Sequence, residues 1–236
     1  MDNKNGYFKS LDSLRFIAFI FVAFHHFDFI ASKIPMLNSH GYAGVDAFFL
    51  LSAFLCTLSL KKEFVNNGFI DVIKFSIKKA VRIFPLYFLA IILVIILWNI
   101  VHVGSPYRII AMVGFVDNFI ASLGATPLFA SAHLWAISAE WQFYFFILLA
   151  VPYLCRSKPR VQVFVLGGSI LFLIIIRYSL MKMGFTFRLI YNSPLRSDSF
   201  LMGIALGLGL FDTIMKKVNT YLLCLVGAVY HHEFDQ

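Results

Sequence analysis

Charged side chains are scarce in this sequence. Asp, Glu, Lys and Arg make up 14% of its 236 residues, whereas an average soluble domain carries about 25%. Hydrophobic residues reach 60%, Phe alone occurs 28 times, and the mean hydropathy is +0.82. A chain so poor in charge cannot cover its apolar surface in water, which excludes a soluble globular domain and a disordered chain. The composition predicts a protein that crosses a membrane several times.

Cysteine and acidic residues are also few. Cys56, Cys155 and Cys224 lie far apart without a Cys-x-x-Cys pair, so we expect neither a disulfide framework nor a metal site. Twelve acidic residues against 20 basic ones give a net charge of +8. In a soluble protein this excess would indicate nucleic acid, but in a membrane protein Lys and Arg gather in cytoplasmic loops. We therefore expect the lipid bilayer, and no nucleic acid, as a partner.

Several apolar runs are long enough for helices that cross the bilayer, which need about 20 residues each. The expected fold class is all-α, a transmembrane bundle of about seven to eight spans that forms one domain over residues 1–236. The candidate spans are Ser13–Ala31, Ala43–Leu60, Val81–Val103, Leu134–Leu154, Val161–Leu180, Ser197–Phe211 and Val218–Tyr230.

The stretch Ile109–Leu123 is apolar but contains Gly114, Asp117 and Asn118. Most Lys and Arg residues fall on the cytoplasmic side when the amino terminus is placed there, which is the orientation that the positive-inside rule favours. Residues 104–133 then cross the membrane twice or not at all, and a re-entrant or interfacial segment is the simplest prediction. A bacterial inner membrane is the expected location.

The first apolar run carries ionisable residues, which are costly inside a membrane and indicate function. Arg15 and His26 are 11 positions apart, so they share one face of a helix, and Asp12 lies near it. We place Arg15 at the cytoplasmic mouth of a cavity and His26 near mid-membrane. A histidine there can act as a base, a proton relay or an acyl carrier, whereas His25 points elsewhere and is more simply satisfied by a neighbouring helix.

A second group lies in the run from His133 to Tyr144. If this run is helical, His133, Glu140 and Tyr144 share a face, and a carboxylate at that depth needs a histidine or arginine partner. An aromatic belt at the membrane interface would explain the tryptophans and Tyr144 but not Glu140.

Two more polar groups flank apolar runs. Lys79 and Arg82 share a helix face at the cytoplasmic start of a span, where cations suit a phosphate-bearing ligand; plain anchoring at the membrane surface explains them about as well. Arg196, Ser197 and Asp198 enter another span from the outer side, where they line the cavity or are simply interfacial.

In order, these segments resemble the membrane acyltransferase 3 family, which includes O-antigen and exopolysaccharide acetylases of bacteria. The resemblance covers about residues 10–210. Its motifs are Leu11-Asp12-Ser13-Leu14-Arg15 followed by His26, the run Gly44 to Phe54, Arg82 to Tyr87, His133 to Tyr144, and Arg196 to Gly203.

The resemblance implies transfer of an acyl group, usually acetyl, from cytoplasmic acyl-CoA to a carbohydrate hydroxyl on the far side of the membrane, with no bound cofactor. It implies catalytic roles for His26, Arg15 and Glu140, and donor binding by Lys79 and Arg82. The residues expected to line the cavity are Asp12, Asp46, Ser52, His133, Trp135, Gln142, Tyr144 and Arg196.

Three features depart from the family pattern. Ala53 replaces the glycine of Ser–Gly–Phe, so a close approach should be tighter there. Lys79 replaces the first arginine of arginine–x–x–arginine, so bidentate phosphate recognition is lost there. Family members have about ten spans, so this chain resembles a product truncated at its carboxyl end. A polytopic transporter or exporter and an inactive fragment are the alternative interpretations.

Overall fold

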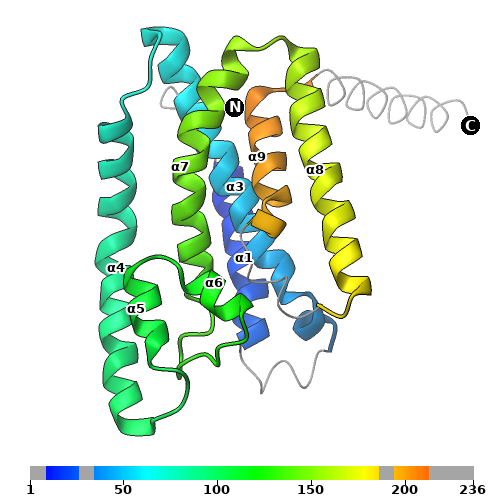
Figure 1. The fold of residues 1–236 in the computed structure, drawn as a ribbon. Helices are drawn as coiled ribbons and strands as arrows, with labels where there is room; N and C mark the ends of the chain where they lie inside the picture. The colour runs from blue at the N-terminus through cyan, green and yellow to red at the C-terminus, as the bar shows by residue number, and fades with distance from the viewer. Residues whose placement is uncertain (1–8, 27–34, 186–193, 213–236) are drawn as a thin grey trace, which may run out of the picture.

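The computed structural model describes residues 9–26, 35–185 and 194–212, and within these ranges the chain forms helices without any strand (Figure 1). The α-helices are α1 Lys9–His26, α3 Pro35–Asn67, α4 Val72–Val101, α5 Tyr107–Val113, α6 Asp117–Ser122, α7 Trp135–Arg156, α8 Pro159–Lys182 and α9 Asp198–Leu208, and a 3₁₀ turn, η2, covers Pro194–Arg196. The all-α prediction is confirmed.

Four of the described helices are long and apolar enough to cross a membrane: α3 over Ala43–Asn67, α4, α7 and α8. The predicted span at Ser13–Ala31 corresponds to α1, which has 18 residues. At the predicted span Ser197–Phe211 the chain forms α9, whose 11 residues are shorter than a membrane crossing requires. The predicted span Val218–Tyr230 lies outside the described residues.

Residues 104–133 form no spanning helix, as predicted. They fold into α5 and α6, of seven and six residues, beside the end of α4 and the start of α7 (Figure 1). Arg108 explains this compactness, since its Nε and a terminal guanidinium nitrogen each donate to one carboxylate oxygen of Asp117 over 2.7 Å. Both side chains are buried. The acidic residue in this apolar stretch is therefore neutralised inside the segment.

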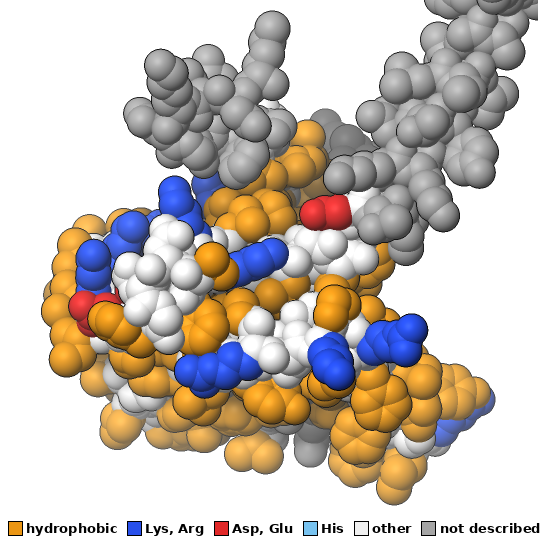
Figure 2. All heavy atoms as spheres, turned by 90° about the horizontal axis from the view of Figure 1, so that it is seen from above, with side chains coloured by type: hydrophobic (Ala, Val, Ile, Leu, Met, Phe, Trp, Pro, Cys, Tyr) orange, Lys and Arg blue, Asp and Glu red, His pale blue; other side chains and the backbone are white. Residues whose placement is uncertain are grey.

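The connections α3–α4 and α7–α8 lie together at one end of the bundle (Figure 1). Asp71 caps α4 there by accepting a hydrogen bond from the Lys74 backbone N–H over 2.9 Å, and its own N–H donates to Glu63 Oε1 over 3.0 Å. Lys and Arg side chains gather on this face (Figure 2). They include Lys62, Lys74, Lys78, Arg156, Lys158 and Arg160, all exposed. We call this face the basic end.

The main core lies where α3, α7 and α9 meet. The Phe200 ring of α9 stacks on Phe143 of α7, with centroids 4.0 Å apart, and on Phe49 of α3, with centroids 4.3 Å apart. The backbones of α3 and α9 also approach closely: a Cβ added to Gly203 would lie 2.6 Å from the Cβ of Ala53. Ala53 therefore stands at a tight contact between helices, as its departure from the family pattern predicted.

Helix α1 packs against α3 through small residues. A Cβ on Gly44 of α3 would meet the Ala18 carbonyl oxygen at 2.6 Å and a methyl carbon of Val22 at 2.8 Å. This contact lies midway between Arg15 and His26 along α1, so the two positions lie on opposite sides of it.

Candidate active site

A hydrogen-bonded cluster joins α3 to α7 inside the bundle. Ser52 Oγ of α3 donates to Glu140 Oε1 of α7. The Tyr144 hydroxyl donates to the same carboxylate oxygen over 2.6 Å and lies 3.2 Å from Ser52 Oγ. One carboxylate oxygen thus accepts two hydroxyl protons, and three residues predicted to share a cavity are in direct contact.

The place of this cluster follows from helix geometry. Glu140 and Tyr144 are four residues apart on α7 and therefore lie on one face. Helix α7 begins at Trp135 and has 22 residues, about 33 Å of rise, so the two side chains lie about 8 Å and 14 Å from its start. The carboxylate therefore sits within the membrane-crossing part of the bundle and not at either surface.

Lys79 brings a positive charge to the cluster. Its Nζ lies 4.8 Å from the ring centroid of Tyr144 and 5.4 Å from that of Phe75. Cys56, one turn along α3 from Ser52, is buried beside Lys79 and lies within range of the charge on Glu140. A carboxylate, an ammonium, two hydroxyls and a thiol thus meet where α3, α4 and α7 come together.

The predicted donor pair of Lys79 and Arg82 is divided in the structure. Lys79 is partly buried in the cluster, whereas Arg82 is exposed on α4. Nearer the basic end, a shallow pocket of about 580 Å³ lies over the first turns of α4 and is lined by Asp71, Ile73, Lys74, Ile77 and Lys78.

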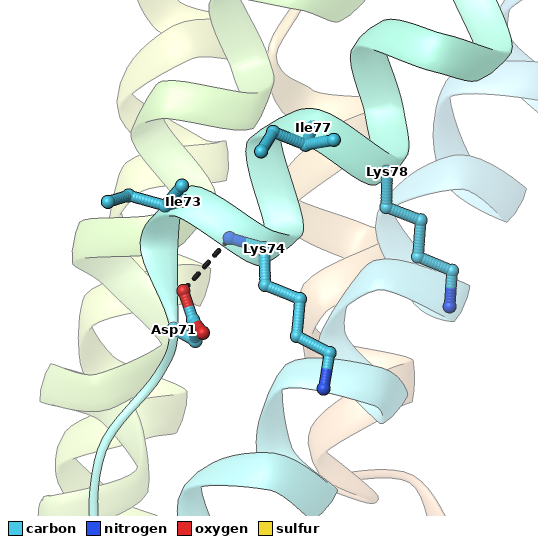
Figure 3. A pocket seen from close by; sticks show the side chains of 5 residues that line it. All are labelled: Asp71, Ile73, Lys74, Ile77 and Lys78. Atoms are coloured by element: carbon cyan, nitrogen blue, oxygen red, sulfur yellow. Dashed lines mark hydrogen bonds between the residues drawn. The ribbon is translucent and has the colours of Figure 1, made fainter.

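Lys74 and Lys78 extend from the same side of α4 in this pocket, and the two isoleucines lie on the other side (Figure 3). Arg82 follows them at the same four-residue spacing, so the three cations form one row along the helix. Lys74 and Lys78 were not among the predicted donor-binding residues, although their four-residue spacing could have identified them.

A second polar group lies between α3, α7 and the start of α9. Arg196 forms an ion pair with Asp46, and its guanidinium carbon lies 5.9 Å from the ring centroid of Trp135. Asp198, the first residue of α9, pairs with Arg177 of α8 over 2.7 Å. Asp46, Trp135 and Arg196 therefore form one group, which is separate from the contacts of Glu140.

In α1, Arg15 pairs with Asp12 over 3.0 Å, and both side chains are partly exposed. This agrees with the predicted common face. His26 is the last residue of α1, and its side chain lies outside the part of the chain that the structure describes. Its catalytic role stays a prediction.

The expectation that His133 shares a helix face with Glu140 is wrong. Helix α7 begins only at Trp135, and a turn in which the Leu134 N–H donates to the Ser131 carbonyl precedes it. His133 lies in this turn and its side chain is exposed, although protein atoms that desolvate part of its imidazole lower its pKa from the ordinary value.

Gln142 serves mainly as a tie between α7 and α6. Its Nε2 donates to the Phe115 carbonyl over 2.7 Å and to Asn118 Oδ1 over 2.8 Å. It also contributes to the wall of a cavity of about 420 Å³ between α7, α8 and α9. That cavity lies on the side of α7 formed by Ala139, Phe143 and Phe146, which faces away from Glu140 and Tyr144.

Comparisons with known proteins find relatives among bacterial O-acetyltransferases. Provisionally named O-acetyltransferases of Staphylococcus aureus strains COL and N315 are each 28% identical over 219 residues, which cover 86% of this chain and 35% of theirs. O-acetyltransferase OatA of strain NCTC 8325 is 28% identical over 169 residues, 65% of this chain and 26% of its own. The chain thus spans about a third of the length of these curated relatives. No solved structure shows significant similarity.

The match to a family covers nearly the whole chain. Residues 8–231 match the family described as acyltransferase domain, Acyl_transf_3. This region includes all the described helices and both polar groups. The chain is an integral membrane protein, and it belongs to this acyltransferase family.

Proposed function

We propose that this chain is the membrane part of an O-acyltransferase that moves an acyl group, by preference acetyl, from cytoplasmic acyl-CoA to a hydroxyl of an exported carbohydrate. The observation that carries the proposal is the contact of Glu140 with Ser52 and Tyr144 beside Lys79, inside the membrane-crossing bundle. Transfer of an acyl group to a hydroxyl needs a base for the hydroxyl proton and a positive charge for the carbonyl oxygen. The cluster holds both.

The donor would enter at the basic end, which we assign to the cytoplasm because Lys and Arg gather there (Figure 2). Lys74 and Lys78 (Figure 3), with Arg82 one turn further along α4, would bind its phosphates. Lys79, which lies at the cluster of Glu140, Ser52 and Tyr144, would then contact the thioester end of the donor.

The acceptor would approach from the opposite end. Asp46 and Arg196 offer a carboxylate and a guanidinium there, with the guanidinium held near the buried ring of Trp135, and such charged groups provide hydrogen bonds for a sugar. Helix α1 completes the proposal: Arg15 and Asp12 belong to the donor side, and His26, at the far end of α1, serves the acceptor side as a base or proton relay.

Inverted membrane vesicles test this proposal. Vesicles that carry the chain receive labelled acetyl-CoA, and both the release of free CoA thiol and the label in carbohydrate are measured. We expect wild type to be active, and Glu140→Gln and His26→Ala to lose at least about 100-fold, in the range typical of general acid–base groups. Glu63→Gln is the matched control, because its amide oxygen still accepts the hydrogen bond from Asp71 at the surface.

Full activity of Glu140→Gln would overturn the assignment of the cluster. Counter-flow of a labelled solute without consumption of acetyl-CoA would overturn the transferase and favour a transporter.

A further inference from the structure

We propose that Ser52 carries the acyl group as a covalent ester between donor and acceptor. This inference rests on the proposed function and names a second step within it. Its basis is that the Ser52 hydroxyl donates to Glu140, while the same carboxylate oxygen is also held by Tyr144. A nucleophile in hydrogen-bonding contact with a base that a third group orients is the arrangement of covalent catalysis.

The direction of the hydrogen bonds favours attack by Ser52. A serine hydroxyl has one proton and two lone pairs. With its proton directed to Glu140, Ser52 Oγ keeps lone pairs for a carbonyl carbon. The Tyr144 hydroxyl proton is also directed to Glu140 over 2.6 Å, so it fixes the carboxylate in place. Glu140 can therefore take the Ser52 proton without moving.

Accessibility distinguishes Ser52 from its neighbours. Cys56 is 1% exposed and Tyr144 is 6% exposed, and the Tyr144 ring is enclosed by the edge-on ring of Phe75 and the Lys79 ammonium. Ser52 is only partly buried. Of the three hydroxyl and thiol groups in the cluster, Ser52 is thus the least buried and the one most open to a thioester.

The charge of Lys79 suits the intermediate. Attack on the thioester places negative charge on the carbonyl oxygen, and a fixed cation in an apolar region stabilises that charge strongly. Lys79 lies against Tyr144 and, among the described residues, forms no salt bridge with a carboxylate. Its charge is therefore available to the developing oxyanion.

The two half-reactions balance. In the first, Ser52 Oγ bonds to the acyl carbon, the carbon–sulfur bond of acyl-CoA breaks, and the Ser52 proton passes through Glu140 to the departing sulfur, which leaves as CoA thiol. In the second, the acceptor hydroxyl gives its proton to Glu140 and attacks the ester carbon. The carbon–oxygen bond to Ser52 breaks, and Glu140 returns the proton to Ser52 Oγ.

The first half-reaction needs no acceptor, which makes it directly testable. Vesicles carrying the chain are given labelled acetyl-CoA, quenched rapidly in acid, and digested for mass spectrometry, while transfer to carbohydrate is measured in parallel. The variants are Ser52→Ala, Ser52→Cys and Ser59→Ala. Ser59 lies two turns along the same helix and is exposed, so it is the matched control.

We expect acetyl on the peptide that contains Ser52 in wild type and in Ser59→Ala. Ser52→Ala should lose this label and at least about 100-fold of transfer. Ser52→Cys should regain a label that neutral hydroxylamine removes, as a thioester requires, while the wild-type ester resists it. Because Ser52→Cys restores attachment through a different bond, a loss in Ser52→Ala is not explained by misfolding.

Undiminished transfer by Ser52→Ala, or acetyl found on Tyr144 or His26 in active wild type, would overturn the covalent role of Ser52 and leave the proposed function standing. If wild type neither releases CoA thiol nor transfers label, the proposed function itself fails.

Discussion

The Tyr144 hydroxyl donates to Glu140, one helical turn earlier on α7, over 2.6 Å, and the Lys79 ammonium lies 4.8 Å from the centroid of the Tyr144 ring. Tyr144 thus contacts both a carboxylate and an ammonium, which carry opposite charges. Its hydroxyl orients the carboxylate, and its ring contacts the cation, which forms no ion pair with Glu140 among the described contacts.

Removing only the hydroxyl should therefore impair catalysis more than folding. Tyr144→Phe keeps the ring contacts with Lys79 and Phe75 but loses one hydrogen bond to a charged group, worth about 1.5–3 kcal/mol. We expect acyl transfer to fall about 10- to 100-fold, in vesicles supplied with labelled acetyl-CoA. Tyr153→Phe, on the exposed face of the same helix, is the control. Equal activity of the two variants would contradict the orienting role.

The two lysines of the pocket on α4, Lys74 and Lys78, predict a change in the affinity for the acyl-CoA donor. Lys74→Gln combined with Lys78→Gln should raise the KM for acetyl-CoA about three- to tenfold with little change in kcat, because each exposed ion pair contributes roughly 0.2–1 kcal/mol. High salt should reduce the difference by screening the charges. Lys62→Gln removes a charge from the same end outside the pocket; if it raises the KM equally, the row has no specific role.

Much of the fold could be predicted because it follows from local patterns. Apolar runs of sufficient length gave the helices that cross the membrane, and the spacing of Arg15 from Asp12, or of Glu140 from Tyr144, placed each pair on a common face. The polar residues at 114–118 correctly indicated a segment that does not cross. In each case the relevant neighbours lie within a few turns of one another.

The remaining features depend on contacts between helices. Nothing in the spacing of Ser52 indicates that it meets Glu140, 88 positions later, and the burial of Lys79 depends on how α4 is rotated against α7. The expectation for His133 was wrong because the first turn of α7 starts after it, and helix boundaries are poorly determined by periodicity. The pairing of Arg108 with Asp117 was missed because its two partners lie on separate short helices.

The buried ion pair of Arg108 with Asp117 predicts that replacing Arg108 destabilises the protein strongly. Arg108→Ala should lower the free energy of unfolding by about 3–5 kcal/mol, since it leaves the Asp117 carboxylate buried without its partner. Arg177→Ala is a matched control, because its ion pair with Asp198 has the same 2.7 Å length but its partners are 29% and 25% exposed. We expect a loss below about 1 kcal/mol there. Thermal unfolding of the purified protein in detergent measures both, and equal losses would contradict the prediction.

The contact between α3 and α9 makes a separate prediction about Gly203. A methyl group at this position would lie 2.6 Å from the Ala53 Cβ and even closer to the Leu50 carbonyl oxygen, so Gly203→Ala forces the two helices apart. The expected cost is about 1–3 kcal/mol, as for overpacking of a core. The variant should also weaken acyl transfer, since Ser52 stands next to Ala53 on the helix that is displaced.

Two further variants test whether the loss in Gly203→Ala comes from the contact between α3 and α9. Gly167→Ala lies on α8 where an added Cβ meets nothing within 4 Å, so it should leave stability unchanged or raise it slightly through better helix propensity. Ala53→Gly in the Gly203→Ala background removes the opposing Cβ but not the contact with the backbone of α3, and should restore part of the stability and part of the activity. If Gly203→Ala is as stable as Gly167→Ala, the two helices do not pack as closely as this contact requires.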